Sequence, residues 1–209
     1  MFKNSFLTSC AAVILMACGG NNSVNSASMD DAGVSADTTA QPVETDKPNS
    51  NYKPAFEGQT RVKGVTTKTP YEAKVLTSDL KKPWGIAILP DGRLLITEKE
   101  GTMRIATTDG QLSAPITGLP AVNAKGQGGL LGLTIDPQFS SNRMVYWVFS
   151  ENRPGGTLTA VAKGRLSDDE KKIENATVIY RATPAHASNL HYGGRILFDK
   201  EGNLVVSTG

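Results

Sequence analysis

The sequence predicts an all-β protein built as a β-propeller, and three observations support this. Short β-type runs separated by turn residues fill the chain from about residue 70 onward. No long amphipathic helix lies between these runs. A unit of apolar run, turn and apolar run also recurs along the chain. Short strands at this spacing, without intervening helices, are typical of closed β-meanders such as propellers.

Residues 1–18 predict a secretory signal that ends in a lipid-attachment site. Lys3 makes the start positive, and the mostly apolar run 6–17 is too short to span a bilayer. Residues 15–20, LMACGG, resemble a bacterial lipobox, in which Cys18 is diacylated and becomes the mature N-terminus. Gly19 is not the aspartate that retains such lipoproteins in the inner membrane, so we expect an outer-membrane anchor facing the periplasm. The alternative is ordinary secretion with cleavage nearby.

The composition after the signal predicts a disordered tether over residues 19–63, followed by a globular part over 64–209. The tether is rich in Asn, Ser, Ala, Asp, Thr, Gln and Pro, and it has too few apolar residues to offset the entropy of ordering. The only cysteines are Cys10 and Cys18, so no internal disulfide is expected in the mature chain. The net charge is +2 without a basic cluster, which argues against a nucleic-acid partner.

Four β-type runs open the globular part, and we expect strands over 73–76, 85–89, 94–97 and 102–106. The tetrapeptide Pro-Asp-Gly-Arg at 90–93 predicts a hairpin turn between the second and third of them. Proline presets the first corner of such a turn, and glycine accepts the positive φ that closes it.

The unit of two strands and a turn occurs three times. Residues 86–97 align without gaps on residues 196–207, and a looser copy spans 131–148. Propeller blades repeat at roughly 40–50 residues with loop insertions, which fits this spacing. A β-sandwich of unrelated hairpins is the alternative.

The number of copies predicts an incomplete ring. Rings of about four to eight blades close and thereby protect their strand edges. Two to two and a half blades are expected here, and the last run, 204–209, has no closing turn. We therefore expect these 209 residues to be the N-terminal part of a longer protein.

His191 is the principal candidate for catalysis. It is one of two histidines in the chain and precedes Gly193, Gly194 and the apolar run 196–198. An imidazole titrates near neutrality and can act as a general base, although a structural histidine is the alternative. His186 lies five residues earlier, but no Cys, Asp or Glu cluster accompanies the pair, so no metal site is assigned.

Six motifs occur in the order found in the glucose/sorbosone dehydrogenases, and residues 70–209 resemble that family. They are PWG at 83–85, LPDG at 89–92, LITE at 95–98, GQGGLLG at 126–132, DPQF at 136–139 and HYGGR at 191–195. The resemblance implies a six-bladed propeller that uses pyrroloquinoline quinone and calcium to oxidise aldose sugars to lactones. The electron acceptor of the reduced quinone is left open.

The resemblance also implies roles for three side chains. His191 matches the general base that takes the proton of the anomeric hydroxyl while hydride passes to the quinone. Gln127 matches a glutamine that hydrogen-bonds the quinone or the sugar oxygen, with a simple turn role as the alternative. Arg195 either supports the cofactor or braces its loop. Leu190 replaces an aspartate of the glucose enzymes, which favours the broader aldose type, and calcium ligands are expected beyond Gly209.

Two other functions stay open at this point. A non-enzymatic propeller lipoprotein for binding or envelope assembly would keep the blades but bind no quinone. A metal-dependent sugar lactonase would show Glu, Asn and Asp ligands at the blade entrances, and these were not found in the sequence. Residues 19–209 alone are expected to be inactive, since most of the cofactor site would be missing.

Overall fold

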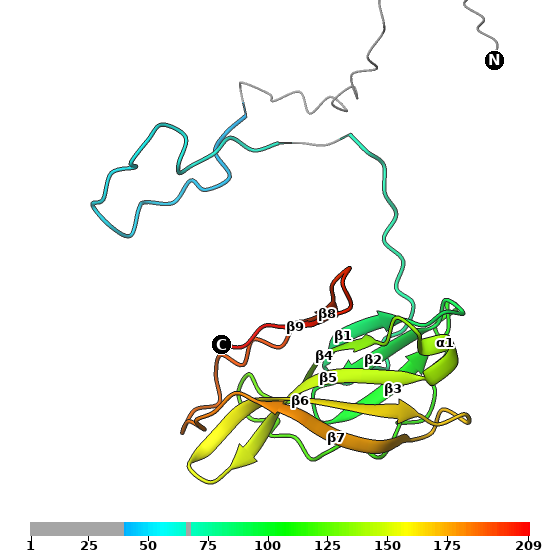
Figure 1. Ribbon diagram of the computed structural model, residues 1–209. Helices are drawn as coiled ribbons and strands as arrows, with labels where there is room; N and C mark the ends of the chain where they lie inside the picture. The colour runs from blue at the N-terminus through cyan, green and yellow to red at the C-terminus, as the bar shows by residue number, and fades with distance from the viewer. Residues whose placement is uncertain (1–39, 66–67) are drawn as a thin grey trace, which may run out of the picture. The chain divides into compact units, whose positions relative to one another are not determined.

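The computed structural model describes residues 40–65 and 68–209, in two compact units that divide between Glu72 and Ala73 (Figure 1). Cys18 and the predicted signal lie outside these residues. Within 40–65 the chain forms a loop closed by main-chain hydrogen bonds, from Val43 N to Val62 O at 3.1 Å and from Gly64 N to Gln41 O at 2.9 Å. Among the described residues, no helix is long and apolar enough to cross a membrane. The disordered tether and the lipid anchor stay predictions.

Residues 73–209 form strands and one short helix. The elements are β1 (Pro83–Ile88), β2 (Leu94–Glu98), β3 (Thr102–Ala106), β4 (Leu130–Ile135), α1 (Phe139–Asn142), β5 (Met144–Arg153), β6 (Gly156–Leu166), β7 (Ile173–Arg181), β8 (Ile196–Phe198) and β9 (Leu204–Val206). They make three antiparallel sheets in the orders β1-β2-β3, β4-β5-β6-β7 and β8-β9 (Figure 1). Each sheet is a meander of consecutive strands, which is the pattern of propeller blades.

The structure confirms three of the four strands expected at the start of the globular part. It also confirms the turn at 90–93, where Gly92 has φ +86° and donates its N–H to Leu89 O at 2.9 Å. The strand expected over 73–76 is wrong. No described strand lies beside that run to form a ladder, and Val75 is 78% exposed there. β6 and β7 were not predicted from the sequence.

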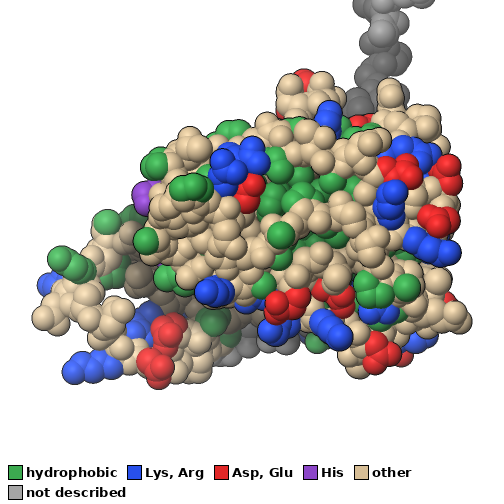
Figure 2. Space-filling model, turned by 90° about the horizontal axis from the view of Figure 1, so that it is seen from below, with side chains coloured by type: hydrophobic (Ala, Val, Ile, Leu, Met, Phe, Trp, Pro, Cys, Tyr) green, Lys and Arg blue, Asp and Glu red, His purple; other side chains and the backbone are tan. Residues whose placement is uncertain are grey.

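The inner strands of the second sheet are largely buried on both faces, whereas β7 has exposed side chains. Successive side chains of a strand point to opposite faces, so neighbouring residues of β5 join different cores. On β5, Trp147 and Phe149 belong to the core shared with the first sheet, whereas Val148 belongs to the core shared with Tyr192 and Ile196. Apolar side chains gather in the middle of the face drawn in Figure 2. The sheets are therefore held face to face by apolar packing, in the order in which they occur along the chain.

Bulges interrupt β1 between Pro83 and Ile86 and β4 between Leu130 and Leu133. The buried hydroxyl of Thr97 compensates for the first bulge. It accepts the N–H of Gly85 at 2.8 Å and donates to Leu131 O at 2.7 Å. Bulges commonly change the direction of side chains near functional sites. Here the hydrogen bonds of Thr97 join the first two sheets beside Trp84, which lies within the bulge of β1.

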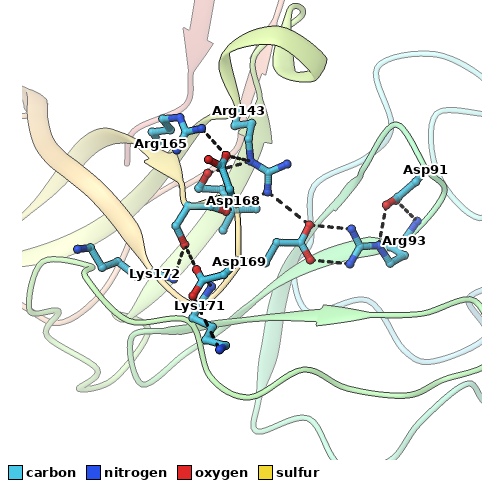
Figure 3. Close-up of polar contacts among 11 residues, drawn as sticks. Asp91, Arg93, Arg143, Arg165, Asp168, Asp169, Lys171 and Lys172 are labelled. Carbon is cyan, nitrogen blue, oxygen red and sulfur yellow. Dashed lines mark hydrogen bonds and ion pairs between the residues drawn. The ribbon is translucent and has the colours of Figure 1, made fainter.

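An ionic cluster connects the first two sheets at the N-terminal end of β2 (Figure 3). The Arg93 guanidinium donates to both carboxylate oxygens of Glu170, at 2.6 and 2.7 Å, and to Asp91 at 2.7 Å. Arg143 also donates to Glu170, at 3.4 Å. The hydrogen bonds from Arg93 lower the pKa of Glu170 below its ordinary value. In Figure 2, acidic and basic side chains lie side by side at the right-hand end of the face, and others are scattered along its lower rim and its left-hand end.

Candidate functional site

A hollow of about 490 Å³ lies where three sheets begin or end, and it brings together most of the predicted site. Its lining includes Trp84 from β1, Lys99 after β2, Gln127 from the loop before β4, and His191 from the loop before β8. These residues come from separate parts of the chain, so the site depends on the packing of the sheets against one another.

His191 and Gln127 are in direct contact. The main-chain N–H of His191 donates to Oε1 of Gln127 at 2.7 Å. This bond turns Oε1 of the Gln127 amide toward the loop of His191. The NH₂ group of the same amide makes no hydrogen bond to a described residue, so it is available to a ligand. His191 has φ +59°, in the left-handed region that non-glycine residues rarely adopt. Its exposed imidazole likewise makes no hydrogen bond to a described residue.

The loops that carry these two residues are joined along their main chains. Gln127 N donates to Asn189 O at 2.8 Å. At Gly126, φ is +54° and an added Cβ would lie 2.5 Å from Asn189 O, so only glycine permits this approach. The glycine-rich motif therefore allows close contact between the two loops.

Tyr192 anchors the second loop from behind. It is 5% exposed, and its hydroxyl lies 2.6 Å from Oγ1 of Thr157 on β6. Thr159, also on β6, donates its hydroxyl to Tyr192 O at 2.8 Å. A buried Tyr192 beside an exposed His191 fixes the direction in which the histidine leaves the loop.

Gly193 and Gly194 allow the backbone to turn toward β8 beside the segment after β9. Their φ values are +68° and +102°. A Cβ at Gly193 would lie 2.5 Å from Ser207 O, and Gly194 N donates to Ser207 O at 2.9 Å. The absence of side chains at the pair therefore permits this close approach of the two segments.

Arg195 lies over Trp84. Its guanidinium carbon is 5.5 Å from the centre of the indole ring, a cation–π distance. A Cβ added at Gly132 or Gly194 would lie 3.3 or 3.4 Å from this ring, so the absence of side chains there makes room for it. Trp84 thus packs where the three sheets meet, yet it remains 40% exposed and lines the hollow.

Lys99 is a site residue that sequence reasoning missed. Its Nζ donates to Gly126 O at 2.5 Å, and its carbonyl accepts the N–H of Leu130 at 3.0 Å. Its position directly after the LITE motif, at the end of a strand, could have indicated Lys99 as a site residue. Lys99 adds a positive charge to the edge of the hollow.

His186 lies outside the hollow. Its main chain pairs with Thr157 in both directions, at 2.8 and 2.9 Å, and its side chain is exposed. Within residues 40–65 and 68–209, no group of three or more His, Cys, Asp or Glu side chains could hold a metal ion.

Comparison with known proteins agrees with this geometry. The family model of the glucose/sorbosone dehydrogenases matches residues 80–209, which include all the lining residues of the hollow. The chain belongs to this family. Its fold class is therefore that of the family's propellers, as predicted, and the alternative of unrelated hairpins in a sandwich is wrong.

Individual members of the glucose/sorbosone dehydrogenase family are similar to this chain over its globular part. The aldose sugar dehydrogenase YliI of Escherichia coli is 40% identical over 138 residues, which cover 65% of this chain and 37% of that protein. The crystal structure of the soluble aldose sugar dehydrogenase from Escherichia coli, in its apo form, has a TM-score of 0.62 at 40% identity, covering 65% and 40% of the two chains. The aldose sugar dehydrogenase of Streptomyces coelicolor, solved with PQQ bound, has a TM-score of 0.55 at 27% identity, covering 65% and 40%. The chain thus spans about two fifths of the length of these relatives.

Proposed function

We propose that the protein is a pyrroloquinoline-quinone-dependent dehydrogenase that oxidises aldose sugars to lactones. One observation carries the proposal: Gln127 and His191, which match the family's motifs, contact each other at the edge of one hollow. The aldose sugar dehydrogenases among its relatives support the substrate class. The proposal includes a six-bladed ring, to which this chain contributes the first blades, and an electron acceptor that is not yet known.

The residues of the hollow suit a planar quinone that carries carboxylates. Trp84 offers an aromatic ring and Lys99 brings positive charge to the edge of the hollow. Arg195 adds a second positive charge over the Trp84 ring. The amide NH₂ of Gln127 can donate to a carbonyl oxygen, since its oxygen is already used by His191. Lys99 retains two further N–H donors after bonding Gly126 O. These groups would hold the cofactor, and calcium belongs to the proposal as a second requirement.

When bound, the quinone supplies the acceptor for the two electrons released by the sugar. His191 takes the proton of the anomeric hydroxyl, and a neutral imidazole suits this step because one of its ring nitrogens is a free acceptor. Gln127 donates a hydrogen bond to an oxygen on which negative charge develops. Its contact with the His191 main chain keeps the base and the donor on the same side of the hollow.

The test is turnover of the full-length protein, supplied with the quinone, calcium and an artificial electron acceptor. We expect aldose oxidation, and we expect His191→Ala to lower kcat by about 10²–10⁴-fold, the usual contribution of a general base. His186→Ala is the matched control and should leave turnover unchanged, since His186 lies outside the hollow. A fully active His191→Ala protein would contradict the assigned base.

We further propose that the protein is anchored through diacylated Cys18 to the outer membrane and faces the periplasm. The lipobox-like segment 15–20 supports this. Incorporation of labelled fatty acid into the wild-type protein, and its loss in Cys18→Ala, would test the proposal. Equal labelling of the two proteins would contradict it.

A further inference from the structure

Asn123 connects the two loops that carry the proposed site. It is 7% exposed and lies in the loop before β4, four residues ahead of Gln127. Its side-chain NH₂ group donates to Oδ1 of Asn152 at 2.8 Å and to Oδ1 of Asn189 at 3.2 Å. Its own Oδ1 accepts the N–H of Lys125 at 2.9 Å. Both donor hydrogens and the acceptor of this buried amide are therefore in use.

Ser150 on β5 holds the main chain of Asn123 at the same place. Asn123 N donates to Ser150 O at 2.8 Å, and the Ser150 hydroxyl donates to Asn123 O at 2.5 Å. The same hydroxyl accepts the N–H of Gly129 at 2.7 Å, which closes the loop around Gln127. These bonds fix the main chain of Asn123 to the second sheet and thereby limit where its side-chain amide can lie.

Asn189 is held at two atoms by this loop. Its side chain accepts from Asn123, and its main-chain carbonyl accepts from Gln127 N at 2.8 Å. His191 follows two residues later, and its N–H reaches back to Oε1 of Gln127 at 2.7 Å. These three bonds connect the loops in the order Asn123, Gln127, His191. None of the charges of the hollow takes part in them.

We infer that Asn123 is a positioning residue, which sets the separation of His191 from Gln127 through Asn189. The inference rests on the proposed function for its effect on turnover, but the geometry it describes belongs to the protein without ligand. Misplacement of reacting groups by about 1 Å costs roughly 10²-fold in rate. Asn123 does not line the hollow and acts only through the loops.

The test compares Asn123→Leu with Asn142→Leu in the full-length protein. Leucine keeps the branched shape and the number of side-chain heavy atoms of asparagine but removes its donors and acceptor. Asn142 is the matched control, because its Oδ1 also makes one local bond, to Met144 N at 2.9 Å, at the opposite end of β5. Asn152→Ala is a second, milder variant at an exposed position, for use if Asn123→Leu does not fold.

Two measurements separate this inference from the proposed function. Hydrogen exchange of the His191 peptide in the protein without ligand should accelerate by at least roughly tenfold in Asn123→Leu, which loses all three side-chain hydrogen bonds of Asn123, and not in Asn142→Leu. In the loaded enzyme, kcat should fall roughly 10- to 100-fold while the KM for the sugar changes little. Unchanged exchange overturns the inference even if no sugar is oxidised. Faster exchange with unchanged kcat in an active enzyme also overturns it, whereas an inactive wild-type protein refutes the proposed function alone.

Discussion

His191 donates its main-chain N–H to Oε1 of Gln127 at 2.7 Å, although 64 residues separate them in the chain. This bond sets the orientation of the Gln127 amide, because the oxygen faces the histidine loop and the NH₂ group is left for a ligand. It also holds His191 in a left-handed conformation, with φ +59°, that the residue alone would rarely adopt.

Replacement of Gln127 by glutamate should separate these two roles. Glutamate keeps an oxygen for the His191 N–H but loses the donor, and it adds a negative charge where negative charge is expected to develop. We expect Gln127→Glu to lower kcat by about 10²–10³-fold, as for the loss of an oxyanion donor, with slow hydrogen exchange retained at His191. Gln138→Glu, at an exposed position before α1, serves as the control. Wild-type turnover in Gln127→Glu would rule out the donor role.

Loss of the Arg195 guanidinium should weaken cofactor binding. Arg195→Met removes the cation over Trp84 but keeps an apolar side chain of similar length. The dissociation constant of the quinone should rise by at least roughly tenfold, the effect of losing one charge-assisted hydrogen bond. Titration of the protein without ligand, followed by Trp fluorescence, measures it. Lys200→Met removes an exposed charge from the β8–β9 turn and should have no effect; equal affinities in all three proteins would argue that Arg195 only braces its loop.

Glu170 should stabilise the contact between the first two sheets. It accepts two hydrogen bonds from Arg93, and its side chain is only 23% exposed. We expect Glu170→Gln to lower the free energy of unfolding by about 1 kcal/mol, at the upper end for partly exposed ion pairs. Urea unfolding at pH 7 measures the change. Glu100→Gln breaks the exposed pair with Lys82 and should cost nothing measurable, so equal losses in both variants would contradict a special role for Glu170.

The stability supplied by Glu170 should depend on pH in one direction. Since hydrogen bonds from Arg93 lower its pKa in the folded state, the unfolded chain binds a proton more readily than the folded protein does. The contribution is therefore complete above the ordinary carboxyl pKa of about 4.3, and it is lost as the pH falls through the lowered value. The gap between the unfolding free energies of wild type and Glu170→Gln should shrink over this acidic window. A constant gap down to pH 2 would disprove the linkage.

Much of the fold could be predicted because it depends on patterns within a few consecutive residues. The repeat of run, turn and run identified β1, β2, β8 and β9, since turn chemistry and apolar alternation act over a few residues. The strand expected at 73–76 failed for the opposite reason. Its local pattern is strand-like, but a strand also needs a partner for its main-chain hydrogen bonds, and no local pattern reports whether one is present.

The site was predictable in its residue types and not in its connections. Gln127 and His191 stand in motifs, so the sequence indicated both. Their contact uses the main-chain N–H of His191, which nearly every residue type possesses, so the sequence does not reveal the contact. Asn123 and Lys99 were missed because their roles depend on which loops lie beside them, and that is decided by the packing of separate sheets.

Each sheet consists of consecutive strands, and this has a consequence for synthesis on the ribosome. The strand pairing of the first sheet is complete at β3, and that of the second is complete at β7, so the strands of each sheet can pair as they leave the exit tunnel. The bond between Gln127 and His191 must wait until the loop after β7 has emerged. Nascent chains halted before that loop should contain paired strands of both sheets but not the contact between Gln127 and His191.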